Sequence, residues 1–230
     1  MVSPPSADRL DLAGLRVVVT AGPTVEDIDP VRFLGNRSTG KMGFALAARA
    51  AARGATTTLI AGPVSLPTPP GVQRVDVRSA LSMQAALRDA LGADLAGADA
   101  LVMSAAVSDY RPAEAHAHKR KRTAERLLLE LVPNPDLLAE IGARRRGAAP
   151  VLVGFAVETD TDDRVVAYAR DKLVKKRVDL VVANHAGDAF GRDDNRATLV
   201  DHAGAEALGF LPKPELADRI LDRVARLCHR

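Results

Sequence analysis

The sequence predicts an α/β protein with a Rossmann-like, doubly wound and mostly parallel sheet that carries helices on both faces. Short apolar runs rich in Val and Leu alternate with longer segments of helical periodicity, the order that right-handed strand–helix–strand crossovers require. Aromatic residues make up only 3% of the chain and Trp is absent, so the core is expected to consist of small aliphatic side chains, as in helix-covered parallel sheets. The length of 230 residues suits one large domain, which we place at 14–230.

The first strand–helix unit lies near the N-terminus. Residues 1–13 are rich in Pro, Ser and Asp and show no hydrophobic period, so we expect a disordered tail or the remnant of a linker. The run 15–20 (LRVVVT) is apolar and β-branched, which is typical of a strand buried on both faces. A long loop over 21–40 follows, and helix formers over 41–53 predict a helix that ends at Gly54.

The same alternation continues to the C-terminus. Strands are expected at 56–61, 72–77, 100–105, 127–131, 151–155, 180–183 and 197–200, and helices at 79–91, 135–145, 163–177 and 214–227. Ser79 is the expected N-cap of the first of these helices. The segment 111–125 interrupts the pattern, because its histidines and the basic run 119–122 have no apolar partners, so we expect a mobile flap there. A further loop is expected over 184–196.

The composition argues against several classes of protein. The single cysteine, Cys228, permits neither an intrachain disulfide nor a CxxC site, and we expect it half-buried on the terminal helix. No stretch approaches the roughly 18 apolar residues of a membrane span, and no signal peptide is recognisable, which favours a cytoplasmic protein without a membrane partner. The net charge of +3 fits a small anionic substrate as well as it fits a polynucleotide, so charge alone does not decide between them. No nucleic-acid partner is expected, because aromatic residues that stack bases are scarce, and no histidine pair has zinc-ligand spacing.

The loop 35–41 (GNRSTGK) carries the strongest local signal for anion binding. Its Gly-x4-Gly-Lys spacing is that of a nucleotide-binding P-loop, but Met42 stands where such a loop needs a hydroxyl for Mg²⁺, and the loop starts well after the strand. Its polar residues still lead into a helix N-terminus, whose amide groups and dipole favour an anion. A plain glycine turn explains the glycines but not the polar residues between them. The predicted anion loop comprises Gly35, Ser38, Thr39 and Gly40.

Two further polar groups are candidates for ligand binding, one in a segment that follows a predicted strand and one on a predicted helix. The segment 104–110 follows a central strand at its carboxyl end, where open α/β sheets bind ligands, and Asp109 within it suits either Mg²⁺ beside a polyphosphate or a turn. Lys172, Lys175 and Lys176 share one helix face; such a cluster is usually a solvated surface, but an anionic ligand would relieve the repulsion between them. The absence of G-x-G-x-x-G after the first strand weakens an NAD(P)-dependent Rossmann oxidoreductase, which stays the alternative function.

Several motifs occur in a fixed order along the chain: GPTVEDIDPVRFLGNRSTGKMGFALA, AGPVSLPTPPGVQRVDV, SAAVSDYRP, NPDLL, GFAVET, ARDKLVKK and DLVVAN. This set resembles phosphopantothenoylcysteine synthetase, the synthetase half of the bifunctional coenzyme A biosynthesis protein of bacteria. The resemblance implies CTP-dependent ligation of 4′-phosphopantothenate with L-cysteine through an acyl-cytidylate, giving 4′-phosphopantothenoylcysteine, CMP and pyrophosphate. It also implies Mg²⁺ with CTP, a homodimer with the active site near its interface, and a flavin-dependent decarboxylase fused or associated upstream. FMN would belong to that decarboxylase only, which this chain lacks.

The resemblance also implies functional residues by position. Asn36 matches an asparagine that contacts the activated acyl group, Arg32 matches an arginine of the same site, and Lys119 matches a flap lysine that closes over CTP. Taken alone, Arg32 and Asp29 predict only an exposed salt bridge of small worth. The implied CTP site comprises Met103, Ser104, Ala105, Asp109, Lys119, Pro135, Asp136, Leu137, Leu138, Phe155, Lys172 and Lys176. Within it, Asp109 is the expected Mg²⁺ ligand, and Lys172 and Lys176 are expected at the triphosphate.

Overall fold

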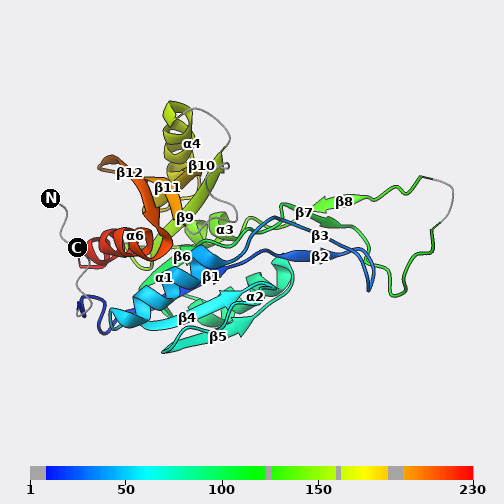
Figure 1. Ribbon diagram of the computed structural model, residues 1–230, viewed down its shortest axis with the longest axis horizontal. Coiled ribbons are helices and arrows are strands. Elements are labelled where there is room, and N and C mark those ends of the chain that lie inside the picture. Colours follow the sequence, from blue (N-terminus) through cyan, green and yellow to red (C-terminus); the bar gives the residue numbers. More distant parts are fainter. Residues whose placement is uncertain (1–8, 123–125, 159–161, 186–193, 230) are drawn as a thin grey trace.

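The computed structural model describes residues 9–122, 126–158, 162–185 and 194–229, and its centre is an eight-stranded sheet (Figure 1). The strands are β1 (Arg16–Ala21), β4 (Thr56–Ala61), β5 (Val72–Asp76), β6 (Ala100–Met103), β9 (Val151–Glu158), β10 (Leu180–His185), β11 (Asp194–Asp201) and β12 (Gly204–Pro212). Their order is β12-β11-β10-β9-β6-β1-β4-β5, and only the pairs β10–β11 and β11–β12 are antiparallel. Connections run in opposite directions from the pair β1–β6, as in a doubly wound sheet. The predicted Rossmann-like, mostly parallel fold is confirmed.

Helices cover both faces of this sheet, as predicted. Along β1, Val17 and Val19 belong to one hydrophobic cluster and Val18 to the other, because successive side chains of a strand point to opposite faces. The first cluster includes residues of α1 (Lys41–Ala52) and α6 (Lys213–Cys228), and the second includes residues of α2 (Ala80–Leu91), α3 (Leu137–Arg144) and α4 (Asp162–Lys175). Ser79 caps α2 through its side chain, as the sequence predicts. Among the described residues, no helix is both long and apolar enough to cross a membrane.

The packed structure begins before the predicted domain boundary. Residues 1–8 lie outside the described residues, so this part of the predicted tail is not described. Leu12 is fully buried, and its amide donates to the Arg53 carbonyl oxygen at 3.1 Å. The Asp11 carboxylate binds the buried Arg53 guanidinium at 2.7 Å. The expectation of disorder up to residue 13 is therefore wrong at its end, because a single apolar residue shows no period by which it could be recognised.

A slender arm leaves the body of the molecule beyond the end of β1 (Figure 1). It contains two antiparallel pairs, β2 (Val25–Asp27) with β3 (Phe33–Gly35), and β7 (Tyr110–Pro112) with β8 (Leu131–Pro133). The sequence predicted a loop in place of the first pair. The strand expected at 127–131 is also wrong, because residues 127–130 lie outside any strand and pairing begins at Leu131. Strands of three residues are too short to show an alternating pattern.

The predicted flap forms the outer part of this arm. Residues 123–125 of the flap lie outside the described residues. In the part described, the His116 amide donates to the Ile28 carbonyl oxygen at 2.9 Å, and the Arg120 amide approaches the Asp29 carboxylate at 3.3 Å. The base of the flap is a regular β pair, so the segment begins as an ordered ribbon next to β2 and β3.

The C-terminal edge of the sheet differs most from the sequence expectation. The loop predicted over 184–196 is shorter at both ends, because β10 reaches His185 and β11 begins at Asp194; residues 186–193 lie outside the described residues. Strand β12 was not predicted. Leu208 is the one buried residue of this edge strand. A strand with a single buried side chain does not need the alternation of apolar and polar residues by which strands are recognised.

Candidate active site

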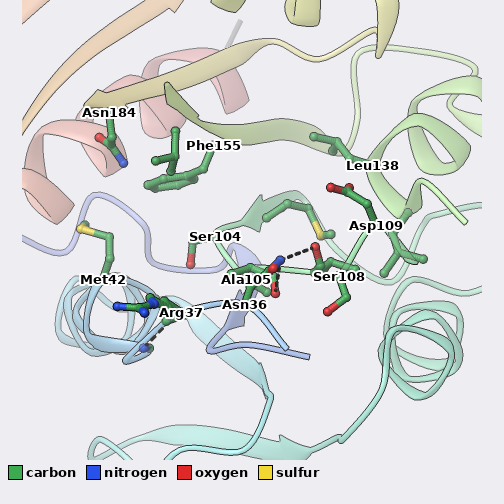
Figure 2. A pocket seen from close by; sticks show the side chains of 18 of the residues that line it. Asn36, Arg37, Met42, Ser104, Ala105, Ser108, Asp109, Leu138, Phe155 and Asn184 are labelled. Atoms are coloured by element: carbon green, nitrogen blue, oxygen red, sulfur yellow. Dashed lines mark hydrogen bonds between the residues drawn. The ribbon is translucent and has the colours of Figure 1, made fainter. Parts of the chain in front are cut away.

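A cavity of about 650 Å³ opens at the carboxyl ends of the central strands, where connections diverge from β1 and β6 (Figure 2). Open α/β sheets bind ligands at this position. Of the residues singled out from the sequence, the cavity is lined by Asn36, Ser38, Thr39, Gly40, Met103, Ser104, Ala105, Asp109, Pro135, Asp136, Leu137, Leu138, Phe155, Lys172 and Lys176. Segments that are far apart in sequence therefore meet around one space.

The wall after β6 is fixed by hydrogen bonds to the chain that follows β1. The Ala106 amide donates to the Gly22 carbonyl oxygen at 2.9 Å, and the Thr24 amide donates to the Ala106 carbonyl oxygen at 3.2 Å. The Ser108 amide donates to the hydroxyl of the fully buried Thr24 at 2.9 Å. From the other side, the Asn134 side-chain amide donates to the Ser108 carbonyl oxygen at 2.9 Å. The backbone of this wall is thus held in place before any ligand binds.

Asn36 lies at the edge of the cavity, next to this wall (Figure 2). Its Nδ2 donates to the Val107 carbonyl oxygen at 3.0 Å and approaches the Ala106 carbonyl oxygen at 3.5 Å. A primary amide carries two hydrogens on nitrogen and an acceptor oxygen. Asn36 can therefore bind a ligand oxygen while its bond to Val107 fixes its orientation.

The N-terminus of α1 forms the anion-binding side of the cavity. Gly40 stands at the N-cap with a φ of 76°, no side chain caps the helix, and no acidic residue lies in its first turn. The approach of α1 to β1 requires glycine at position 43, because a Cβ there would lie 2.5 Å from the Ala21 Cβ and 2.7 Å from the Ser104 Oγ. Lys41 also lines the cavity. The helix dipole, its N-terminal amides and this lysine together favour a negatively charged group.

Lys172 of α4 and Lys176, which directly follows α4, line the cavity and have partners within the protein. Lys172 donates to the Phe155 carbonyl oxygen, and Lys176 pairs with Asp136 at 2.8 Å. Lys175 instead pairs with Asp171 at 2.7 Å, and it does not line the cavity. The expectation of three lysines left to repel one another is therefore wrong. Burial acts to raise the pKa of Asp136, but the bonds from Lys176 and the Ala139 amide outweigh it, so this pKa is lowered.

Arg32 and Lys119 lie on the arm and do not line this cavity, and neither does Gly35. Arg32 binds the Asp29 carboxylate and donates to the Arg120 carbonyl oxygen at 3.0 Å. Asp29 has no exposed side-chain surface, so the pair is not the exposed salt bridge that the sequence predicted. The bond from Arg32, assisted by backbone amides against the effect of burial, holds the pKa of Asp29 well below its usual range.

The cavity also includes residues that sequence reasoning did not assign to the site. They are Met42, Gly43, Asn134, Val157, Asn184, Asn195 and Lys213, whereas Arg37, Lys41 and 106–108 belong to the loop 35–41 and the segment 104–110 that the sequence singled out. Met42 and Asn134 adjoin residues that were singled out, but Asn195 and Lys213 come from β11 and the start of α6. Asn184 ends the DLVVAN motif at the carboxyl end of β10, and this position was the signal that could have identified it.

Carboxylates around the cavity suit a metal ion that is shared with a ligand. Among the residues that the structure describes, no group of three or more His, Cys, Asp or Glu side chains could hold a metal ion. Asp109 lines the cavity with an exposed side chain. Mg²⁺ commonly takes one or two carboxylates together with phosphate oxygens and water, so Asp109 fits such a shared site.

Curated relatives match almost the whole chain. It is 44% identical over 216 residues to the coenzyme A biosynthesis bifunctional protein CoaBC of Vibrio cholerae, covering 91% of this chain and 52% of that protein. The corresponding protein of Mycolicibacterium smegmatis is 46% identical over 231 residues, covering 95% of this chain and 55% of that protein. The chain therefore spans about half the length of the curated relatives it matches.

Solved structures and a family model agree with these relatives. The crystal structure of the C-terminal domain of a coenzyme A biosynthesis bifunctional protein CoaBC superposes with a TM-score of 0.80 at 35% identity, covering 95% of this chain and 98% of that one. The model of the DNA/pantothenate metabolism flavoprotein C-terminal domain matches residues 12–227, which include every element that lines the cavity. The chain belongs to the family of DNA/pantothenate metabolism flavoprotein C-terminal domains.

Proposed function

We propose that this chain catalyses the CTP-dependent ligation of 4′-phosphopantothenate with L-cysteine, a step of coenzyme A biosynthesis. The products are 4′-phosphopantothenoylcysteine, CMP and pyrophosphate. Membership of the family and the similarity to CoaBC proteins support this proposal. The single observation that carries it is the cavity, in which Asn36, the N-terminus of α1 and the wall after β6 surround one space. We place the activity in one domain, which extends the predicted range 14–230 to include the packed residues Asp11 and Leu12, and we expect it in the cytoplasm.

The first step joins the two phosphorylated substrates. A carboxylate oxygen of 4′-phosphopantothenate attacks the α-phosphorus of CTP, the bond to the β-phosphate oxygen breaks, and pyrophosphate leaves with that bond's electrons. The N-terminus of α1 and Lys41 line the cavity and would lie beside the point where negative charge gathers. Fixed dipoles stabilise such charge without having to reorient during the reaction.

The second step forms the amide bond. The cysteine amine attacks the acyl carbon of the acyl-cytidylate, CMP leaves as the carbon–oxygen bond breaks, and the nitrogen loses a proton. Asn36 is held by Val107 at the edge of the cavity, where its amide can donate to the acyl oxygen. An amide suits this role because it adds no charge beside a phosphate and does not compete as a nucleophile.

Mg²⁺ would accompany CTP, with Asp109 as its protein ligand. When bound, the ion neutralises part of the phosphate charge. Asp136 also lines the cavity, but its pairing with Lys176 at 2.8 Å engages it within the protein. The remaining predicted residues at 103–105, 135–138, 155, 172 and 176 would enclose the nucleotide as lining groups.

We propose a homodimer in which the arm of one copy serves the cavity of the other. Arg32 and Lys119 are expected to contact substrates, but in a single chain both lie outside the cavity. The arm extends away from the body (Figure 1) and exposes Phe33, Tyr110 and Leu128. A second copy would cover these apolar side chains and bring the two cationic residues to a site. The flap would then exclude water from the acyl-cytidylate.

The length of the curated relatives supports a proposal about a second domain. Because this chain covers about half of the bifunctional relatives, we propose that a flavin-dependent decarboxylase is fused or associated upstream. FMN would belong to that domain and not to the cavity described above.

The test is an assay of the purified protein with CTP, Mg²⁺, 4′-phosphopantothenate and L-cysteine. We expect pyrophosphate release that requires the first three components, and an amide product that also requires cysteine. Absence of pyrophosphate release from a folded protein would contradict the ligase.

The alternative is an NAD(P)-dependent oxidoreductase. Thermal unfolding with CTP and Mg²⁺ against NADPH separates the two functions, because a ligand that binds only the folded state raises the unfolding temperature. We expect stabilisation by CTP with Mg²⁺. Stabilisation by NADPH alone would favour the oxidoreductase.

A further inference from the structure

Asn134 joins two walls of the cavity. It directly follows β8, begins the NPDLL motif and lines the cavity just before the residues 135–138. Its side-chain Nδ2 donates to the Ser108 carbonyl oxygen at 2.9 Å, and its backbone amide donates to the Asp109 carbonyl oxygen at 2.7 Å. Two hydrogen bonds from one residue therefore connect the start of α3 with the wall after β6.

The wall that Asn134 holds contains groups on which the proposed reaction depends. The Val107 carbonyl oxygen accepts the hydrogen bond that orients Asn36. Asp109, the proposed Mg²⁺ ligand, lies two residues farther along the same wall (Figure 2). Ser108 stands between them and is only 6% exposed. A shift of the Ser108 backbone would therefore displace both of its neighbours.

The other end of the Asn134 side chain binds the arm. Arg111 of β7 donates from one guanidinium nitrogen to the Asn134 Oδ1 at 3.1 Å and to the Pro133 carbonyl oxygen at 2.7 Å. Strand β7 pairs with β8, where Arg111 lies opposite Val132. Because the guanidinium is always charged, its hydrogen bonds are stronger than those between neutral groups. The Asn134 oxygen is thus held by the arm and its nitrogen holds the cavity wall.

A primary amide suits this position because it presents a donor and an acceptor at the same time. An aspartate has the same shape but offers only acceptors when it is ionised, so one of its oxygens would face the Ser108 carbonyl oxygen. An alanine makes neither bond. The amide of Asn134 therefore matches both of its neighbours, and the two replacements separate the bond to the wall from the bond to the arm.

We propose that Asn134 is a positioning residue for the ligation, and that it couples the position of the arm to the wall after β6. Its role in catalysis rests on the proposed function. When Arg111 holds Asn134, the segment 107–109 keeps the orientation that Asn36 and Asp109 require. A displacement of the arm moves Arg111 and loosens the wall. Because the arm is proposed to join a second copy, dimer formation and the geometry of the site are linked through this residue.

The first measurement compares turnover with stability in Asn134→Ala. We expect kcat for pyrophosphate release to fall about tenfold, which corresponds to the loss of one hydrogen bond. The KM for CTP should stay within about threefold of wild type, because the N-terminus of α1 and the lysines 172 and 176 are unchanged. The unfolding temperature should fall by only about 2–4 °C. A purely structural role would give the same fall in unfolding temperature but unchanged turnover at room temperature, where nearly all of the protein is folded.

The link to the arm is tested by Arg111→Met, alone and together with Asn134→Ala. We expect Arg111→Met to lower turnover about threefold, and the double variant to be no slower than Asn134→Ala, because both changes break one connection. Independent effects would multiply to about thirtyfold. Arg126→Met is the matched control, since it removes another exposed arginine of the arm and should leave turnover unchanged.

Amide hydrogen exchange over 104–110 gives a readout that does not depend on turnover. We expect faster exchange in both Asn134→Ala and Arg111→Met, because the wall opens more readily when either bond is lost, and exchange at the wild-type rate in Arg126→Met. Wild-type exchange in the first two variants would contradict the coupling, whether or not the protein is a ligase.

Two results in the assay would overturn the inference. Wild-type turnover in both Asn134→Ala and Asn134→Asp would show that the wall keeps its geometry without this amide, and multiplying effects in the double variant would show that Arg111 acts independently of Asn134. If Asn134→Ala does not fold, Asn134→Asp decides, because it loses the donor to Ser108 but keeps an acceptor for Arg111. An inactive wild type would count against the proposed function, whereas an active wild type with insensitive variants counts only against this inference.

Discussion

At the scale of single residues, Asn36 depends on its neighbours for its orientation. Its Nδ2 is bound to the carbonyl oxygen of Val107, in a wall that Thr24 holds through Ser108. The side chain is short, so it presents its amide to the cavity with little freedom. Replacing the amide by a carboxylate keeps the shape but puts a negative charge beside the phosphate and removes the donor.

We predict that Asn36→Asp lowers cysteine-dependent turnover by about 100-fold or more, the usual effect of removing one donor to a developing negative charge. Rapid-quench analysis should show either accumulation of the acyl-cytidylate or failure to form it. Thermal unfolding should stay near wild type, because the side chain is exposed. Normal turnover in the variant would refute the role of Asn36.

Cys228 provides a second prediction at this scale. Burial, with smaller effects from Asp99 and Asp179, raises the pKa of its thiol to about 11. Its Sγ also lies 3.7 Å from the Asp99 carbonyl oxygen, in the half-buried position expected from the sequence. The thiolate is the reactive form, so we predict that Cys228 reacts with a disulfide reagent at pH 8 about 100-fold more slowly in the folded protein than in denaturant. Equal rates, followed by absorbance, would contradict this burial.

At the scale of elements, the contact between α1 and β1 sets the position of the anion-binding helix N-terminus. We predict that Gly43→Ala destabilises the protein by about 1–3 kcal/mol, because its Cβ would meet the Cβ of Ala21 and force the helix outward. Chemical denaturation measures this change in the free energy of unfolding. Gly147→Ala is the control, since an added Cβ there meets nothing within 4 Å. Equal stability of the two variants would show that α1 can shift without cost.

Elements with a clear hydrophobic pattern could be predicted from the sequence, and those whose stability depends on distant partners could not. The buried runs of β1 and β4 were recognised because β-branched and apolar residues follow one another, as VVVTA in β1 and TTTLIA in β4. Strand β12 has one buried side chain and pairs only with β11, so its extended form depends on a partner that local sequence does not reveal. The short pairs β2–β3 and β7–β8 were missed because strands of three residues are too short to show an alternating pattern.

Among the residues of the candidate site, some could likewise be predicted from the sequence, and others could not. Asp109 follows β6 near the switch point of the sheet, where strand order predicts a ligand, and Asn36 was singled out through the resemblance to a known family. Asn195 and Lys213 reach the cavity only because β11 turns back antiparallel to β10 and α6 then packs against α1. This topology follows from packing over the whole chain, so no local pattern around these two residues pointed to the site.

At the scale of the whole molecule, the arm predicts that two copies share each site. We predict that Asn36→Asp and Lys119→Gln, each nearly inactive as a pure protein, regain activity when they are coexpressed. A mixed dimer would have one site with both native residues and one site with neither, so a random mixture should reach about a quarter of wild-type activity. The Lys121→Gln variant serves as the control, since it changes another exposed lysine of the same flap and should keep its activity.

The coexpression experiment is read by turnover per protein after purification of differently tagged pairs. Restored turnover requires that Lys119 of one chain acts with Asn36 of the other. No recovery in a confirmed mixed dimer would place both residues in the same chain's site, and would contradict the shared arrangement. Lys119→Gln alone should unfold at nearly the wild-type temperature, because its side chain is exposed.

Strands β11 and β12 and helix α6 follow the parallel strands in the sequence, so during translation they emerge after the parallel part of the sheet. The wall that holds Asn195 and Lys213 lies far downstream of the loop with Asn36, so it leaves the ribosome after that loop. A nascent chain can complete the parallel part of the sheet and still lack one side of the cavity. The complete cavity should therefore form only after α6 has emerged and docked against α1.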